Sequence, residues 1–206
     1  MLYTETVNPE LLELLNELMA HELFSDFFLV GGTGLALQIG HRHSIDIDLF
    51  GKRDLEEIEI SAFLNKLGKV QVLKKSKNIL IYSINGIKVD FVNYSYPRVK
   101  APIVIGNMRL ASKEDIGAMK LNAISGRGSK KDFIDLYFLL QEFSLKDLFG
   151  FFKEKYPDGS EFLVLKSLSY FGDADLDEIP KMAKEIEWDE VKLAIGQKVK
   201  KFLSDS

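Results

Sequence analysis

The chain has 206 residues, with 27 Lys and Arg against 31 Asp and Glu, and 46% of its residues are hydrophobic. This length and apolar content suffice to bury a core, which excludes general disorder, and the net charge of −4 argues against a protein that coats nucleic acid without specificity. The absence of cysteine excludes disulfide scaffolds and thiolate metal sites and fits a reducing compartment.

The first half of the chain alternates between helical and strand patterns. Polar and apolar residues alternate along several short segments, and Asn85-Gly86 is a strong signal for a hairpin between two of them. The predicted elements are, in order, a helix beginning at Asn8-Pro9, a strand over 27–30, a helix over 33–39, a strand over 44–50, a helix over 54–67, and strands over 69–75, 78–84 and 87–94.

The second half is helical in pattern. Ser112 opens the sequence S-K-E-D, a capping box with Asp115 at its fourth position, and predicts a helix to about Ser125. A second amphipathic helix is expected over 131–143, and most of the remaining chain follows a helical pattern. We therefore expect an α+β fold, with an α/β core over 1–110 and a helical region over 111–206 that packs on the core and closes its cleft.

Three carboxylates carry the strongest chemical signal in the sequence. Asp46 and Asp48 lie two residues apart on a predicted strand, so their side chains project from one face. Asp90 lies on another apolar strand, and the three would converge if these strands were neighbours. Such oxygen ligands suit Mg²⁺ or Mn²⁺, completed by water and phosphate oxygens. The alternative interpretation is a solvated strand face, which is the commoner origin of an isolated D-x-D.

The turn Gly31-Gly32-Thr33 precedes the first two carboxylates. Glycines let backbone amides approach a phosphate, and the N-terminus of the following helix favours anions. A simple tight turn between strand and helix is the alternative. An EF-hand loop that begins at Asp46 is rejected, because Phe50 and Arg53 do not fit its pattern, and the dinucleotide fingerprint and the P-loop are absent.

These residues together resemble a known family. The glycine turn, the segment Gly40 to Phe50 and the later Asp90 resemble the AbiEii-type nucleotidyltransferases, a branch of the DNA polymerase beta-like superfamily. The resemblance extends to Lys120 and to the segment Lys130 to Leu136, and it covers roughly residues 27–140. It implies a polymerase-beta-like nucleotidyltransferase core with a mixed β-sheet and flanking helices.

The resemblance also implies a role for each matching residue. Asp46, Asp48 and Asp90 would be the catalytic and metal-binding residues, with Asp90 also acting as the base. Asp135 is expected to cap or pair within its own helix rather than contact substrate. The implied nucleotide-binding residues are Gly31, Gly32, Thr33, Arg42, Ser44, Lys120, Lys131 and Asp132. Arg42 has a second interpretation, in which it pairs with a carboxylate and holds its turn.

The implied function is a Mg²⁺-dependent enzyme that transfers a nucleoside monophosphate from a nucleoside triphosphate to a hydroxyl acceptor, with tRNA or another RNA among the candidates. The family resemblance further implies a toxin-like component of a toxin–antitoxin or phage-defence system, with an antitoxin as partner. The basic segment 113–131 is either an RNA contact or a solvated helix face. The alternatives are a non-catalytic nucleotide-binding protein that acts through a partner and a small-molecule nucleotidyltransferase.

Location follows from the same sequence. No apolar run approaches the roughly 20 residues that span a bilayer, and the first residues lack the basic segment of a signal peptide. We expect a cytoplasmic protein without a membrane partner.

Overall fold

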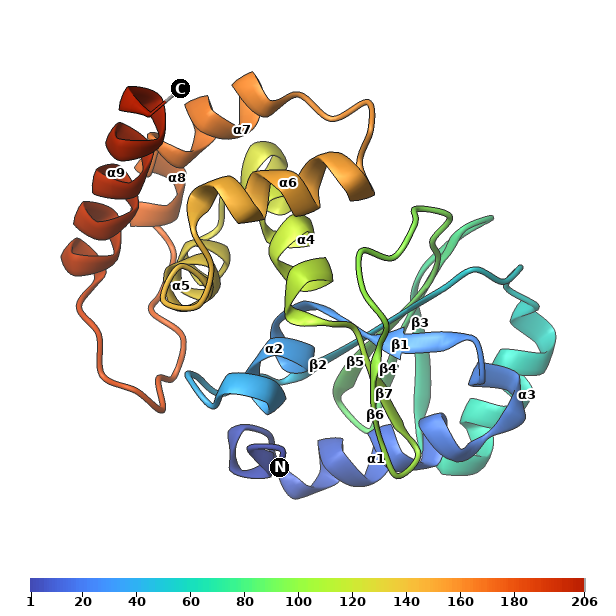
Figure 1. Ribbon diagram of the computed structural model, residues 1–206. Coiled ribbons are helices and arrows are strands. Elements are labelled where there is room, and N and C mark those ends of the chain that lie inside the picture. Colours follow the sequence, from blue (N-terminus) through green and yellow to red (C-terminus); the bar gives the residue numbers. More distant parts are fainter. Residues whose placement is uncertain (206) are drawn as a thin grey trace. The chain divides into compact units, whose positions relative to one another are not determined.

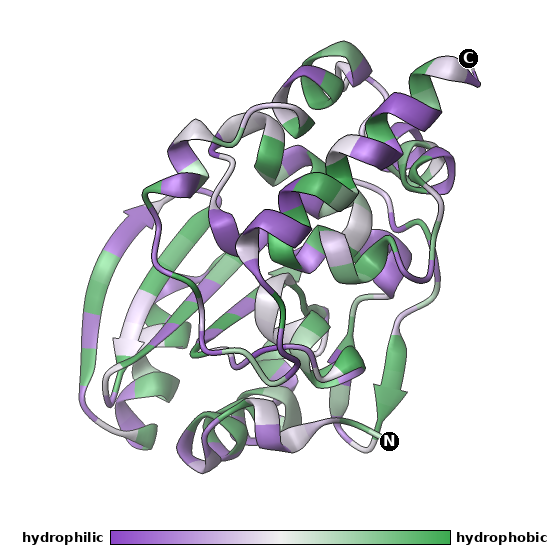
Figure 2. Cartoon of the chain, turned by 90° about the vertical axis from the view of Figure 1, so that its left-hand side faces the viewer, coloured by the Kyte–Doolittle hydropathy of each residue, from purple (hydrophilic) through white to green (hydrophobic). Residues whose placement is uncertain are grey.

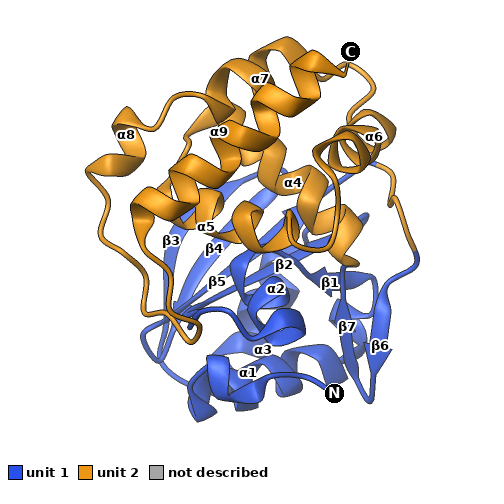
Figure 3. Cartoon of the chain, turned by 60° about the vertical axis from the view of Figure 1, so that its left-hand side comes forward, with its two compact units in different colours: residues 1–96, 101–111 blue, residues 97–100, 112–206 orange. Residues whose placement is uncertain are grey.

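The computed structural model describes residues 1–205 and divides into two compact units (Figure 3). Unit 1 contains residues 1–96 and 101–111, and unit 2 contains residues 97–100 and the chain from Ser112 onward. Polar and apolar segments alternate along the strands and helices of both units (Figure 2). The expected packing of the helical region on the core stays a prediction.

Unit 1 is built on a mixed seven-stranded sheet with the strand order β3-β4-β5-β2-β1-β7-β6 (Figure 1). In its centre, β2 pairs in parallel with β5 and antiparallel with β1, and β1 pairs in parallel with β7. The strands are β1 (Phe27–Leu29), β2 (Asp46–Gly51), β3 (Val70–Ser76), β4 (Ile79–Ile84), β5 (Ile87–Asn93), β6 (Ile103–Ile105) and β7 (Met108–Leu110).

Helices of unit 1 cover the apolar face of this sheet. Leu11 and Leu15 of α1 and Leu64 of α3 join one buried cluster with Ile47 and Leu49 of β2. Because side chains alternate along a strand, the residues between these aliphatics on β2 project from the opposite face. The helices of unit 1 are α1 (Pro9–Ala20), α2 (Gly31–Ile39) and α3 (Glu57–Leu67), with short 3₁₀ turns at η1 (Thr4–Thr6) and η2 (Glu22–Phe24).

The turn between β4 and β5 is the predicted hairpin. Asn85 and Gly86 both have positive φ angles, 51° and 87°, and Ile84 pairs directly with Ile87 across the turn. Positive φ at both central positions is the backbone of a type I′ turn, which matches the twist of the strands. The prediction of this hairpin is confirmed.

Some element boundaries differ from expectation. Helix α3 begins at Glu57 rather than at Asp54, and the short hairpin formed by β6 and β7 was not predicted. Each of these two strands has three residues, which is too short for a pattern of alternation to identify.

Unit 2 consists of helices. Ser112 caps α4 as expected, because its side chain accepts a hydrogen bond from the amide of Asp115. The Asp115 carboxylate accepts hydrogen bonds from the amides of Val99 and Lys100, and it forms an ion pair with Lys155 at 2.7 Å. The helices are α4 (Lys113–Gly126), α5 (Lys130–Leu139), α6 (Leu145–Lys155), α7 (Glu161–Leu168), α8 (Gly172–Asp175) and α9 (Trp188–Ser204), so α5 ends before the expected Phe143.

Candidate active site

Two central strands of unit 1 bring the predicted carboxylates together. Strands β2 and β5 are parallel neighbours, in a register that places Asp48 opposite Asp90 and Asp46 opposite Lys88. Because side chains alternate along a strand, all four project from the sheet face opposite to the one on which the apolar residues of β2 and β5 are buried. The expectation that these strands are neighbours is confirmed.

Lys88 belongs to this cluster, although the sequence argument did not include it. Its ammonium lies 2.6 Å from Oδ1 of Asp90, and the Asp90 side chain is 16% exposed. Lys88 and Asp90 are two residues apart on one strand, and this spacing was the signal in the sequence from which their shared face could have been predicted. The lysine charge offsets part of the negative charge that three neighbouring carboxylates would otherwise concentrate on this face.

The glycine turn brings backbone close to the carboxylate face. Gly31 opens α2 with φ of 65°, and a Cβ atom built on it would overlap the carboxylate of Asp48. A Cβ atom on Gly32 would overlap the guanidinium of Arg42. Neither position has room for a larger side chain, so glycine is required at both. The carboxylate of Asp48 occupies the space beside Gly31, and the guanidinium of Arg42 occupies the space beside Gly32.

Buried hydroxyls anchor the start of β2. Thr33 is 1% exposed, donates a hydrogen bond to the main-chain carbonyl of Asp46, and lies 2.7 Å from the Ser44 hydroxyl. Arg42 is also buried and donates to the carbonyl of His43 at 3.0 Å. These contacts fix the start of the strand that carries Asp46 and Asp48, and direct phosphate contact by Thr33, Ser44 and Arg42 stays a prediction.

The carboxylate face can supply part of the ligands of a divalent cation. Within residues 1–205, no group of three acidic or histidine side chains is close enough to enclose one ion. Mg²⁺ is commonly held by one or two carboxylates together with water and substrate phosphates, so this donor set still fits it. Asp46 and Asp48 would be the ligands from the protein, on the same strand face as the ion-paired Asp90.

The predicted lysine and aspartate of unit 2 form a buried ionic cluster. Lys120 on α4 is 5% exposed, and its ammonium lies 2.8 Å from Asp132 and 2.5 Å from Asp135, both on α5. Asp132 also accepts hydrogen bonds from Arg127 and from Ser129. Asp135 thus pairs with a lysine of the neighbouring helix, a contact that helical spacing alone did not show.

Electrostatics keep Asp132 ionised in this cluster. Burial alone would raise the pKa of its carboxyl group, but the charge and hydrogen bond of Lys120, the hydrogen bond of Ser129 and the charge of Arg127 outweigh burial and lower the pKa. Lys131, the neighbouring residue in the predicted set, is instead exposed on α5.

The basic segment 113–131 is largely engaged with its own unit. Lys113 forms an ion pair with Glu142, and Lys130 is buried and donates to the main-chain carbonyl of Asp177. With Lys120 buried and paired and Arg127 paired with Asp132, four of the five cations of this segment hold structural contacts.

Solved structures, a nucleotidyltransferase toxin among them, share this fold. JHP933 from Helicobacter pylori has a TM-score of 0.61 with 20% identity, over 95% of this chain and 90% of that chain. MenT4, the nucleotidyltransferase toxin Rv2826c from Mycobacterium tuberculosis H37Rv, has a TM-score of 0.63 with 13% identity, over 95% of this chain and 82% of that chain. The mixed seven-stranded sheet with flanking helices, shared with these solved structures, confirms the expected α+β fold class.

Sequence comparison adds the family. The model of the nucleotidyl transferase AbiEii toxin family, described as a type IV toxin–antitoxin system, matches residues 13–202. The chain belongs to this family, as its motifs predicted. A relative in Aquifex aeolicus (strain VF5), the uncharacterized protein aq_aa25, is 37% identical over 94% of this chain and 96% of its own length. Among residues 1–205, no helix has both the length and the apolar character needed to cross a membrane.

Proposed function

We propose that this protein transfers a nucleoside monophosphate from a nucleoside triphosphate to a hydroxyl group of an RNA, with Mg²⁺ or Mn²⁺ as the cofactor. The observation that carries the proposal is the register of β2 and β5, which places Asp48 opposite Asp90 on the face that also carries Asp46. Membership in a nucleotidyltransferase toxin family supports the reaction class.

Each carboxylate has a proposed role. Asp46 and Asp48 would hold the cation, which when bound supplies charge stabilisation to the phosphates. Asp90 would accept the proton of the acceptor hydroxyl. The hydroxyl oxygen then forms a bond to the α-phosphorus as the bond between that phosphorus and the bridging oxygen breaks, and pyrophosphate leaves. Gly31 and Gly32 allow close backbone approach at the start of α2, where the helix N-terminus favours an anion.

The nucleotide contacts predicted in unit 2 fall into two kinds. Lys131 is exposed, so its ammonium group can reach a phosphate in the solvent. Lys120 and Asp132 already satisfy each other inside the helical unit, so we propose that they organise the segment that presents Lys131. The family description of a toxin–antitoxin system supports an antitoxin as the protein partner.

The test is a transfer assay with and without Mg²⁺. Purified protein is incubated with each α-³²P-labelled nucleoside triphosphate and total cellular RNA, alongside Asp46→Ala/Asp48→Ala and the matched surface variant Asp26→Ala. Label on RNA that requires Mg²⁺ and is lost only in the double variant is the expected result. Nucleotide binding without transfer to RNA or to small hydroxyl compounds would contradict it and favour a protein that acts through a partner.

A further inference from the structure

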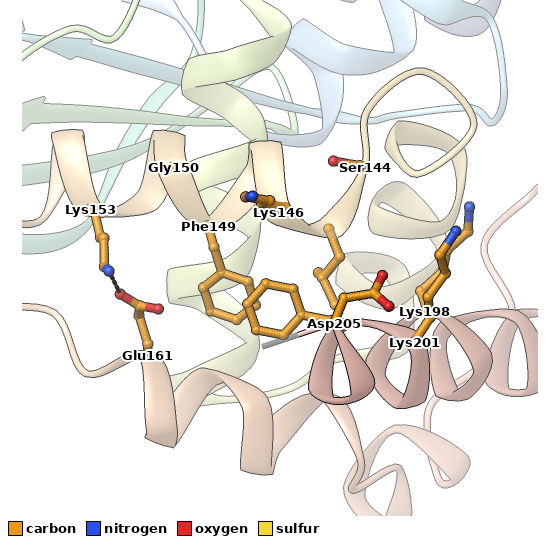
Figure 4. A pocket seen from close by; sticks show the side chains of 11 residues that line it. Ser144, Lys146, Phe149, Gly150, Lys153, Glu161, Lys198, Lys201 and Asp205 are labelled. Carbon is orange, nitrogen blue, oxygen red and sulfur yellow. Dashed lines mark ion pairs between the residues drawn. The ribbon is translucent and has the colours of Figure 1, made fainter.

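A pocket of about 570 Å³ lies within the helical unit, between α6, α7 and α9 (Figure 4). Its volume lies in the range of about 300–1,000 Å³ that is usual for ligand sites. All its lining residues fall between Ser144 and Asp205, and nothing in the transfer chemistry described above uses them.

The floor of the pocket is aromatic. Phe149 of α6 and Phe202 of α9 stack with ring centroids 5.0 Å apart and an interplanar angle of 24°. Phe149 is 3% exposed, whereas Phe202 is partly exposed and borders the opening. Flat ring surfaces of this kind are where nucleobases stack in proteins that bind single strands.

The rim of the pocket is basic. Four exposed lysines line it from two helices, and Figure 4 shows Lys198 and Lys201 side by side on α9: Lys146, Lys153, Lys198 and Lys201. Two acids accompany them, of which Glu161 is already paired with Lys153. A surplus of positive charge therefore surrounds an apolar floor, in a chain whose overall charge is −4.

From this juxtaposition we infer that the pocket binds single-stranded RNA, with one base against the partly exposed Phe202, whose ring is stacked on the buried Phe149, and the adjoining phosphates on the lysine rim. The inference rests on the proposed function, because the bound strand would be the acceptor of the nucleoside monophosphate. Phosphates pair with lysines irrespective of sequence, and bases of any identity offer a ring face. An acidic peptide would use the lysines but has no group that requires the aromatic floor.

The experiment measures binding of a short fluorescein-labelled single-stranded RNA by fluorescence anisotropy at several salt concentrations. The test variant is Lys198→Glu/Lys201→Glu, and the matched control is Lys166→Glu/Lys200→Glu, which makes the same charge change on exposed lysines of α7 and α9 outside the pocket. A third variant, Phe202→Leu, keeps an apolar floor and removes one ring. Thermal unfolding midpoints verify that all the variants are folded.

We expect the pocket variant to bind the RNA about tenfold more weakly or worse, with a shallower dependence of affinity on salt, and the control to bind within about twofold of wild type. Phe202→Leu should weaken binding with an unchanged salt dependence. Equal losses in both lysine variants would overturn the inference, because they would show a response to total charge. A polyglutamate peptide or free ATP that binds through the same lysines while RNA does not would also overturn it.

The experiments distinguish an incorrect assignment of the pocket from an incorrect assignment of the transfer reaction. Asp26→Ala should bind this RNA as wild type does, because Asp26 lies in unit 1 and outside the proposed transfer site. Pocket-dependent RNA binding without any transfer contradicts the proposed reaction alone. Transfer to RNA that is unaffected by Lys198→Glu/Lys201→Glu contradicts the pocket alone.

Discussion

Asp48 and Asp90 are direct partners in the register of two parallel strands, although 41 residues separate them in the chain. The same register places Lys88 opposite Asp46, and the Lys88 ammonium pairs with Asp90. This arrangement sets Asp90, which pairs with a lysine, apart from Asp46 and Asp48, and it leads to a distinct expectation for each carboxylate.

Asp48→Asn should reduce nucleotidyl transfer by about 100-fold or more, because it removes one of the two negative charges proposed to hold the cation. The free energy of unfolding should change little, since the side chain is only partly buried and asparagine has the same shape. Radiolabel transfer and urea unfolding measure the two effects, with Asp26→Asn as the surface control. Full activity in Asp48→Asn would remove this residue from the proposed site.

Asp90→Asn should lower kcat by about 100-fold or more and leave KM for the nucleoside triphosphate nearly unchanged, because a base acts in the chemical step. Steady-state kinetics with varied triphosphate separate the two parameters. A rise in KM at constant kcat would instead assign Asp90 to nucleotide binding. Lys88→Met tests the ion pair on the same strand and should alter activity less than Asp90→Asn does.

Metal removal offers a test that involves no substitution. Transfer should cease after chelation with EDTA and return on addition of Mg²⁺ or Mn²⁺, since the carboxylate donor set suits hard divalent cations. Circular dichroism should show no loss of helix on chelation, because both cores are built from apolar side chains. Transfer that persists in EDTA would exclude the proposed metal dependence.

Gly31→Ala should destabilise unit 1 by about 1–2 kcal/mol through its positive φ angle alone, and it should also displace the Asp48 carboxylate and impair transfer. Gly196→Ala is the matched control. Gly196 lies within α9 with open space at the Cβ position, so alanine there should stabilise the protein by about 0.5–1 kcal/mol. Equal effects of the two substitutions in urea unfolding would contradict the proposed close approach at Gly31.

Asp132→Asn should destabilise the protein by about 3 kcal/mol near neutral pH, because it breaks a buried pair with Lys120. The pKa of Asp132 is lowered in the folded state, so its stabilising effect is complete above the pKa of the unfolded chain and disappears as pH falls through the folded pKa. Urea unfolding at several acidic pH values should show the wild type and the variant converging. A constant difference between them would indicate that the loss arises from packing instead of ionisation.

Local sequence was sufficient for much of unit 1. The hairpin at Asn85-Gly86 and the alternation around Asp46 depend on residues adjacent in the chain, so their patterns were readable directly. The three-residue strands β6 and β7 escaped prediction because so short a segment carries no periodic signal. The end of α5 at Leu139 was likewise not marked by a glycine or proline.

The sequence by itself determined that Asp46 and Asp48 share a face of one strand, that glycines precede them, and that these motifs belong to a nucleotidyltransferase family. Only the tertiary structure decided that Asp90 is paired with Lys88, that Asp135 faces Lys120, and that lysines of α6 and α9 line one pocket with a stacked pair of rings. The physical reason is that backbone geometry sets the direction of a side chain from its immediate neighbours. Contacts between distant segments depend instead on which apolar faces are buried against each other.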